Sequence, residues 1–176
     1  ADAIGTDSHH SICDVNGTLW FYSRLYGFRR LRGTNQIEDV GYRVFPDVVV
    51  SSSQGTNAIS SKRVHSVVFN EEQLVLFHLP IELDNGVVRY PGDQSKILVC
   101  DFSRQFEEDN EYDVSGRLVQ QLPKTRWWPW DNFNFHGGAC VYQNRLLFHE
   151  RRYNSATATT EFFVSLYQQN DSIEDY

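Results

Sequence analysis

Histidines that recur at one position of a repeated pattern are the residues of this chain best suited to chemistry. His9, His65 and His136 each begin a segment of fourteen residues, and the three segments align without a gap. Three neutral imidazoles that converge on one axis could ligate Zn or Fe, as in a His-metal enzyme. The alternative is that each histidine packs beside a strand and bonds to its neighbour. We expect no metal and no other cofactor.

The second candidate is an aromatic loop in which three tryptophans and two phenylalanines fall within nine residues. Exposed tryptophans beside Asn and Asp can grip a sugar ring or the side chains of a partner protein. Trp and Arg also dominate binding hot spots. In the alternative, the loop plugs one end of the core and Pro129 fixes its path. The residues expected to bind a partner are Arg126, Trp127, Trp128, Trp130, Asp131 and Phe133.

Common catalytic motifs are absent from the sequence. It has no Gly-x-Ser-x-Gly elbow, Walker loop, Gly-x-Gly-x-x-Gly, His-Glu-x-x-His or Cys-x-x-Cys. The pattern therefore favours a non-catalytic binding module that recognises a protein or peptide through the aromatic loop. A carbohydrate-binding, lectin-like module is the first alternative, and a His-metal propeller enzyme is the second.

The repeated segments 9–22, 65–78 and 136–149 are the elements that must position these residues. Each segment reads as strand, polar turn, strand, with Phe at its thirteenth position. The dipeptide Asn16-Gly17 is the strongest short hairpin signal among them. The chain therefore predicts antiparallel hairpins that repeat.

Cysteine also recurs, at the fifth position of the first and third segments. We expect Cys13 and Cys140 to occupy matching buried positions on strands, with a disulfide between them as the alternative. The odd total of three Cys argues against a complete disulfide framework and favours a cytoplasmic location. Sequons at Asn16 and Asn170 leave secretion as the alternative. The lack of Met indicates a processed chain or part of a longer one, and a homo-oligomer is also compatible.

The order of elements over residues 118–168 resembles a kelch-type propeller blade. A leading Pro123 and Arg126 precede the small residues Gly137 and Gly138, and strand, turn, strand, long loop and strand follow. The Gly-Gly pair that ends the second strand of a kelch blade is missing from all three repeats. The resemblance implies four-stranded blades around an axis. We therefore expect an all-β fold of antiparallel hairpin repeats that forms a partial or small β-propeller. A single β-sandwich or β-barrel is the alternative.

The rest of the chain predicts one domain. We expect a flexible N-terminus over residues 1–8, an all-β domain over 9–168 and an acidic tail over 169–176. Interleaved Arg and aromatic residues at 24–33 predict a solvated edge strand, and the acidic stretch 104–113 predicts a long exposed loop. The net charge of −7 opposes non-specific nucleic-acid binding, and no apolar run approaches the roughly 18 residues of a membrane helix. The expected partner is therefore a protein or peptide, or else a carbohydrate.

Overall fold

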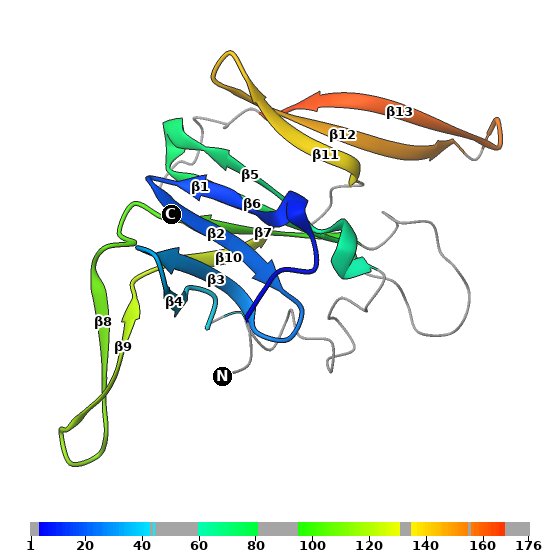
Figure 1. Cartoon of the computed structure of the whole chain (residues 1–176). Coiled ribbons are helices and arrows are strands. Elements are labelled where there is room, and N and C mark those ends of the chain that lie inside the picture. Colours follow the sequence, from blue (N-terminus) through cyan, green and yellow to red (C-terminus); the bar gives the residue numbers. More distant parts are fainter. Residues whose placement is uncertain are drawn as a thin grey trace, which may run out of the picture.

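The computed structural model describes residues 4–42, 44, 60–80, 95–130, 135–154 and 156–167, and over these residues the protein is all-β (Figure 1). Its strands pair antiparallel in three larger sheets and one separate hairpin. The expectation of an all-β fold built from antiparallel hairpins is confirmed.

The first sheet has the order β1 (Cys13–Val15), β2 (Thr18–Ser23), β3 (Gly27–Arg32), β4 (Gln36–Asp39). The middle sheet has the order β5 (His65–Phe69), β6 (Leu74–Pro80), β7 (Ser95–Asp101), β10 (Arg126–Trp130). The third sheet consists of β11 (Phe135–Tyr142), β12 (Arg145–Asn154) and β13 (Thr159–Leu166). The separate hairpin pairs β8 (Glu108–Tyr112) with β9 (Leu118–Pro123). Short 3-10 helices are η1 (His9–Ser11), η2 (Ser60–Arg63) and η3 (Asn70–Glu72).

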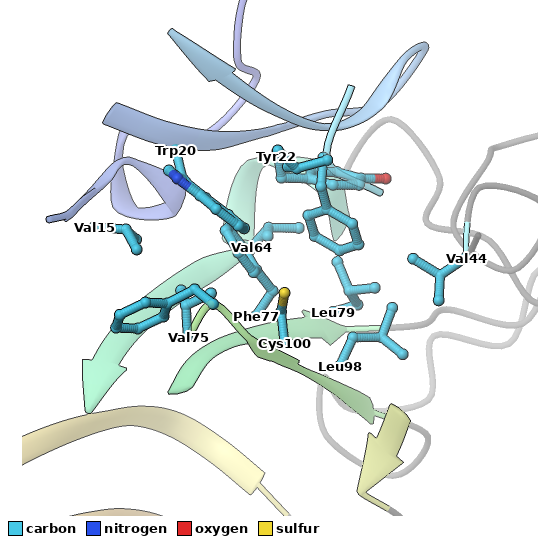
Figure 2. Packing of buried hydrophobic residues seen from close by; sticks show 13 residues of the cluster. Val15, Trp20, Tyr22, Val44, Val64, Val75, Phe77, Leu79, Leu98 and Cys100 are labelled. Atoms are coloured by element: carbon cyan, nitrogen blue, oxygen red, sulfur yellow. The ribbon is translucent and has the colours of Figure 1, made fainter. Parts of the chain in front are cut away.

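One hydrophobic core lies between the first sheet and the middle sheet. Figure 2 shows Trp20 and Tyr22 of the first sheet directed toward Phe77 and Cys100 of the middle sheet. Along β6 the alternate residues from Val75 onward belong to this core, because successive side chains of a strand point to opposite faces. The named side chains of this core are all fully buried, namely Trp20, Tyr22, Val75, Phe77 and Cys100.

A second core lies between the middle sheet and the third sheet. Leu76 and Val99 supply it from the middle sheet, and Leu146 and Phe148 supply it from β12. The middle sheet is therefore covered on both faces, and β6 is correspondingly apolar at almost every position. The three sheets stack in the order of the sequence.

Each of the three histidine-led segments corresponds to the first hairpin of one of the three stacked sheets. The segment 9–22 contains η1, β1 and most of β2, the segment 65–78 contains β5 and most of β6, and 136–149 spans β11 and half of β12. The first strands of the sheets lie side by side, with β5 in contact with both β1 and β11. By contrast, β4 and β13 lie at opposite ends of the molecule in Figure 1.

Two segments differ from the expectation of exposed polar chain. The acidic stretch 104–113 is not one long loop, because Glu108–Tyr112 is the strand β8. Its turn is closed by Asp113, whose carboxylate accepts hydrogen bonds from the backbone N–H groups of Ser115 and Arg117. Pairing with β9 satisfies the backbone of this acidic strand, a long-range contact that composition does not reveal.

The Arg-rich segment 24–33 is also not a solvated edge. Its strand β3 lies inside the first sheet, and Arg30 is only 3% exposed. Arg30 bonds to the carboxylate of Glu38 at 2.5 Å and to the carbonyl of Gln105 at 2.6 Å. A buried guanidinium is tolerated here because both partners satisfy it.

Ser8 ties the chain N-terminal to the first repeat into the fold. Its hydroxyl donates to the carbonyl of Val64 at 2.6 Å, and its side chain is buried. The hydroxyls of Thr6 and Ser11 bond to each other at 2.8 Å. Thr6 and Ser8 therefore make hydrogen bonds to the domain expected to begin at residue 9, and the flexibility of residues 1–8 stays a prediction. The acidic tail expected over residues 169–176 lies outside the described residues.

The expectation for the cysteines is wrong in part. All three thiols are free, so the alternative of a Cys13–Cys140 disulfide is excluded. Cys13 is half-buried, whereas Cys140 is exposed. Both lie at matching places in their hairpins, but Cys13 faces the middle sheet and Cys140 faces away from it. The first and third segments share one register, because the fifth position pairs with the twelfth in both. The difference in exposure arises because, among the described sheets, only one lies against the third sheet.

Candidate functional site

A polar hollow lies where the beginnings of the three sheets meet. Its volume is about 620 Å³, and it opens to solvent. The first sheet contributes His10 from η1, the middle sheet contributes residues from η2 and β5, and the third sheet contributes β11. The lining residues are His10, Lys62, Arg63, His65, Ser66, Gly138 and Ala139.

Hydrogen bonds between η1 and the start of β5 hold one wall of the hollow. The Ser66 hydroxyl donates to the carbonyl of His10 at 3.4 Å, and the bond from Ser8 to Val64 lies two residues away. Behind this wall, burial raises the pKa of the Cys13 thiol to about 11, against a smaller lowering by its hydrogen bond with Ser66. Cys13 therefore stays a protonated thiol and carries no charge into the hollow.

His65 forms the base of the hollow together with His78. The two residues are cross-strand partners in β5 and β6, and their Nδ1 atoms lie 3.3 Å apart. Burial lowers the pKa of His65, a backbone hydrogen bond at Arg63 opposes this, and the charge of His10 adds to the lowering. At neutral pH His65 is therefore an uncharged imidazole. A hydrogen bond between the two Nδ1 atoms needs one protonated and one unprotonated nitrogen. Protonation of both Nδ1 atoms would bring two N–H groups face to face and break this bond.

The charge in the hollow is opposite in sign to that of the whole chain. Lys62 and Arg63 are both exposed and positively charged, whereas the net charge of the protein is −7. No Asp or Glu belongs to the lining in the described part of the chain. An anionic group would therefore find two cations and several N–H donors without a competing carboxylate.

Gly138 brings β11 close to the imidazole of His65. A Cβ atom added at Gly138 would lie 3.6 Å from His65 Nε2, which is an ordinary contact distance. His65, His78 and Phe148 also surround a much smaller space between the middle sheet and the third sheet, directly below. The His65 ring therefore lies at the mouth of the interface between these two sheets.

The structure does not place His9, one of the three candidate metal ligands, in the described lining of the hollow with His65. His9 is exposed, and its ring packs on His10 at 3.7 Å between centroids. His10, not His9, lines the hollow with His65. The side chain of His136 lies outside the described residues. Among the residues that are described, no three His, Cys, Asp or Glu side chains are placed to hold a metal ion.

The expected aromatic loop is wrong for residues 126–130, which form the strand β10. Its pairing with β7 places Trp127 opposite Cys100 and Trp130 opposite Ile97. Trp127 packs against the core between the first sheet and the middle sheet, whereas Trp128 and Trp130 pack against the core between the middle sheet and the third sheet. Three adjacent aromatic residues therefore serve both faces of one strand.

Specific contacts fix two of these rings. Trp127 stacks on Phe28 with centroids 4.5 Å apart, and its Nε1 donates to the carbonyl of Val40 at 2.7 Å. Trp130 stacks on Tyr167 at 4.8 Å. All three tryptophans are half-buried and Arg126 is exposed, whereas Asp131 and Phe133 lie outside the described residues. The core-plug alternative describes the tryptophans better than an exposed loop does.

A second hollow, of about 340 Å³, lies between the first sheet and the β8–β9 hairpin. Its cations are already paired, because Arg29 bonds to Asp39 at 2.9 Å and Arg30 bonds to Glu38. This hollow offers little net charge to a ligand. The hollow at His65 is thus the better candidate, and sequence reasoning missed Lys62 and Arg63 because they lie in a polar stretch outside the repeats.

Comparison of the chain with family models, with curated proteins and with solved structures found no match in any of the three. In the described residues, no helix is long and apolar enough to cross a membrane.

Proposed function

We propose that this protein is a non-catalytic binding module that recognises a protein or peptide partner, and that the hollow at His65 receives an acidic group of that partner. The observation that carries the proposal is the hollow itself, which places Lys62 and Arg63 beside His10 and has no carboxylate in its described lining. The fitting group is a Glu or Asp side chain or a C-terminal carboxylate, because cations and N–H donors bind carboxylates by charge-assisted hydrogen bonds.

The geometry supports recognition of a charge at a fixed position. Ser66 holds η1 against β5, and His65, which is bonded to His78, forms the base of the hollow. A hollow that is already formed needs little ordering when a ligand enters, and this favours affinity. The tryptophans of β10 pack against the two cores and are not part of the lining of the hollow.

The test measures binding of a fluorescent hexaglutamate peptide by anisotropy, with hexaserine and hexalysine peptides as comparisons. The variant Lys62→Ala/Arg63→Ala should weaken binding of hexaglutamate by about tenfold or more, since each cation to a bound carboxylate is worth roughly 1–3 kcal/mol. The matched control is Arg104→Ala/Arg117→Ala, which removes two exposed cations from another part of the surface.

Equal losses in the two double variants would mean that only the overall charge matters, and the proposed site would be rejected. Equal binding of hexaserine and hexaglutamate would also reject it. Quenching of Trp fluorescence by simple sugars without any peptide binding would instead favour the carbohydrate-binding alternative.

A further inference from the structure

The stack of sheets has a direction that the repeats reveal. At the thirteenth position, Phe77 faces back to the first sheet and Phe148 faces back to the middle sheet. At the twelfth position, Trp20 faces forward to the middle sheet and Leu76 faces forward to the third sheet. Each sheet therefore has a back face, which meets the preceding sheet, and a forward face, which meets the next one.

Among the described residues, neither of the other two stacked sheets lies against the forward face of the third sheet. Leu147 is the twelfth-position residue there, and it aligns across the strands with Cys140 and Leu166. Val164 and Phe162, on the same face, are 72% and 56% exposed. An antiparallel sheet that faces water normally carries polar residues on that side, whereas this face combines five apolar residues with Arg145 and His149.

In the described part of the chain, the back face of the first sheet likewise meets neither of the other two stacked sheets. Phe21 is its thirteenth-position residue and is half-buried. Beside it, Leu19, Leu31 and Ile37 align across β2, β3 and β4 as one apolar row. Leu19 is 46% exposed and Ile37 is 37% exposed. The two ends of the stack are thus a forward face and a back face whose described apolar residues are partly exposed.

We propose that the forward face of the third sheet packs on the back face of the first sheet of a second copy of this chain. Both existing interfaces between sheets join a forward face to a back face, so the new contact continues an arrangement that the molecule already uses twice. If each copy donates both faces, two copies close head to tail, as heterologous contacts do when the rotation completes a ring. Two sets of three sheets make six, within the range of four to eight blades in propellers.

This inference is independent of the proposed binding function, because its residues lie outside the hollow at His65. In the closed pair, the first strands of all six sheets would surround one axis, and the two hollows would open toward it. Binding of hexaglutamate and self-association are measured separately, so failure of one leaves the other standing.

The experiment measures the mass of the purified chain by sedimentation equilibrium over a range of micromolar concentrations. We expect a mass near twice the 20.5 kDa of one chain. Val164→Lys in the forward face and Leu19→Lys in the back face should each raise the dissociation constant by about tenfold or more, because a charge would be buried without a partner. Val119→Lys is the matched control, since Val119 is 66% exposed and belongs to the separate β8–β9 hairpin.

Mixing the two lysine variants tests the direction of the contact. The Leu19→Lys chain keeps an intact forward face and the Val164→Lys chain keeps an intact back face, so the mixture should associate where neither variant does alone. A contact between two forward faces would be insensitive to Leu19→Lys, and this result would overturn the proposal. A monomer at all concentrations would overturn it as well and would assign the faces to a different partner. A mass that rises without limit would reject the closed pair.

Circular dichroism and thermal unfolding of each variant establish that it is folded. Because Val164 and Leu19 are both exposed in one copy of the chain, each lysine variant should have the same circular dichroism spectrum as the wild type.

Discussion

The middle sheet and the third sheet start from the same repeated hairpin, but they have different surroundings. Leu76 and Phe77 of β6 are both buried, because a sheet lies against each face. The corresponding residues of β12 are Leu147, which is half-buried, and Phe148, which is buried. The sequence of a repeat thus specifies two apolar faces, and the position of the sheet in the stack decides whether both are covered.

The comparison separates two contributions of aromatic residues to stability. In the middle sheet, aromatic residues hold the neighbouring sheets together. In the third sheet, Phe162 and Phe163 are exposed and can contact another molecule. The following substitutions measure how large the difference is.

The largest effect is expected for Phe77→Ala in the middle sheet. Phe77 is fully buried and its ring lies 4.6 Å from that of Phe28. The cavity should lower the free energy of unfolding by about 3–5 kcal/mol, because sheets packed on both sides relax only partly. Phe162→Ala on the third sheet should cost about 0.5 kcal/mol or less. Urea denaturation of dilute protein measures both, and equal losses would contradict the contrast between the sheets.

A somewhat smaller loss is expected at Trp127, which is half-buried but joins the first sheet to the middle sheet. Trp127→Ala should lower the free energy of unfolding by about 3 kcal/mol through loss of packing. Trp127→Phe keeps most of the stacking on Phe28 but loses the hydrogen bond to Val40, and it should cost about 1 kcal/mol. Denaturant titration distinguishes the two variants. Wild-type stability for Trp127→Ala would return this ring to the list of binding residues.

Gly41 gives a third measure of how tightly the first sheet is packed. A Cβ atom at this position would lie 2.8 Å from the ring and 2.9 Å from the Cβ atom of Phe28. Gly41→Ala should therefore destabilise the protein by about 1–3 kcal/mol through overpacking. Gly5→Ala is the control, because nothing lies within 4 Å of its added methyl group. Thermal unfolding of both variants would show an unchanged midpoint at Gly41 if this packing were loose.

The repeated hairpins could be predicted from the sequence because their signals are local. Asn16 and Gly17 form the turn between β1 and β2, both with positive φ, and the alternation of apolar residues marks the flanking strands. The pairing of strands that are far apart in the sequence could not be predicted in this way. The strand β10 joins β7 across the inserted β8–β9 hairpin, so a run of tryptophans that looked like a loop is the edge of the middle sheet.

The candidate site was predicted even less completely, for a related reason. The recurrence of histidine led to His65, but the hollow is formed by segments that meet only after the sheets stack. Lys62 and Arg63 lie outside the repeated segments. His10 follows the aligned His9 by one position in the sequence. Periodicity identifies side chains that share a face, whereas a site made of strand beginnings depends on the angle at which whole sheets meet.

The smallest effect is expected from the pH dependence of the interface between the middle sheet and the third sheet. Burial holds the pKa of His65 below its ordinary value of 6.5, and His78, His10 and Arg63 are the groups that face it. As the pH falls below 6.5, the unfolded chain binds a proton at this residue before the folded chain does. The free energy of unfolding should therefore decrease over this range and level off below the lowered pKa of the folded state.

His65→Gln removes this titration and should flatten that part of the pH profile of the unfolding free energy. His9→Gln, which removes an exposed imidazole outside the interface, is the matched control. Protonation should loosen the third sheet on the middle sheet first, because His65 lies at the mouth of the space that these sheets share. Hydrogen exchange at β11 and β12 should therefore quicken at mildly acidic pH in the wild-type chain more than in the His65→Gln variant. Equal acid sensitivity in the wild type and in His65→Gln would show that another group controls this interface.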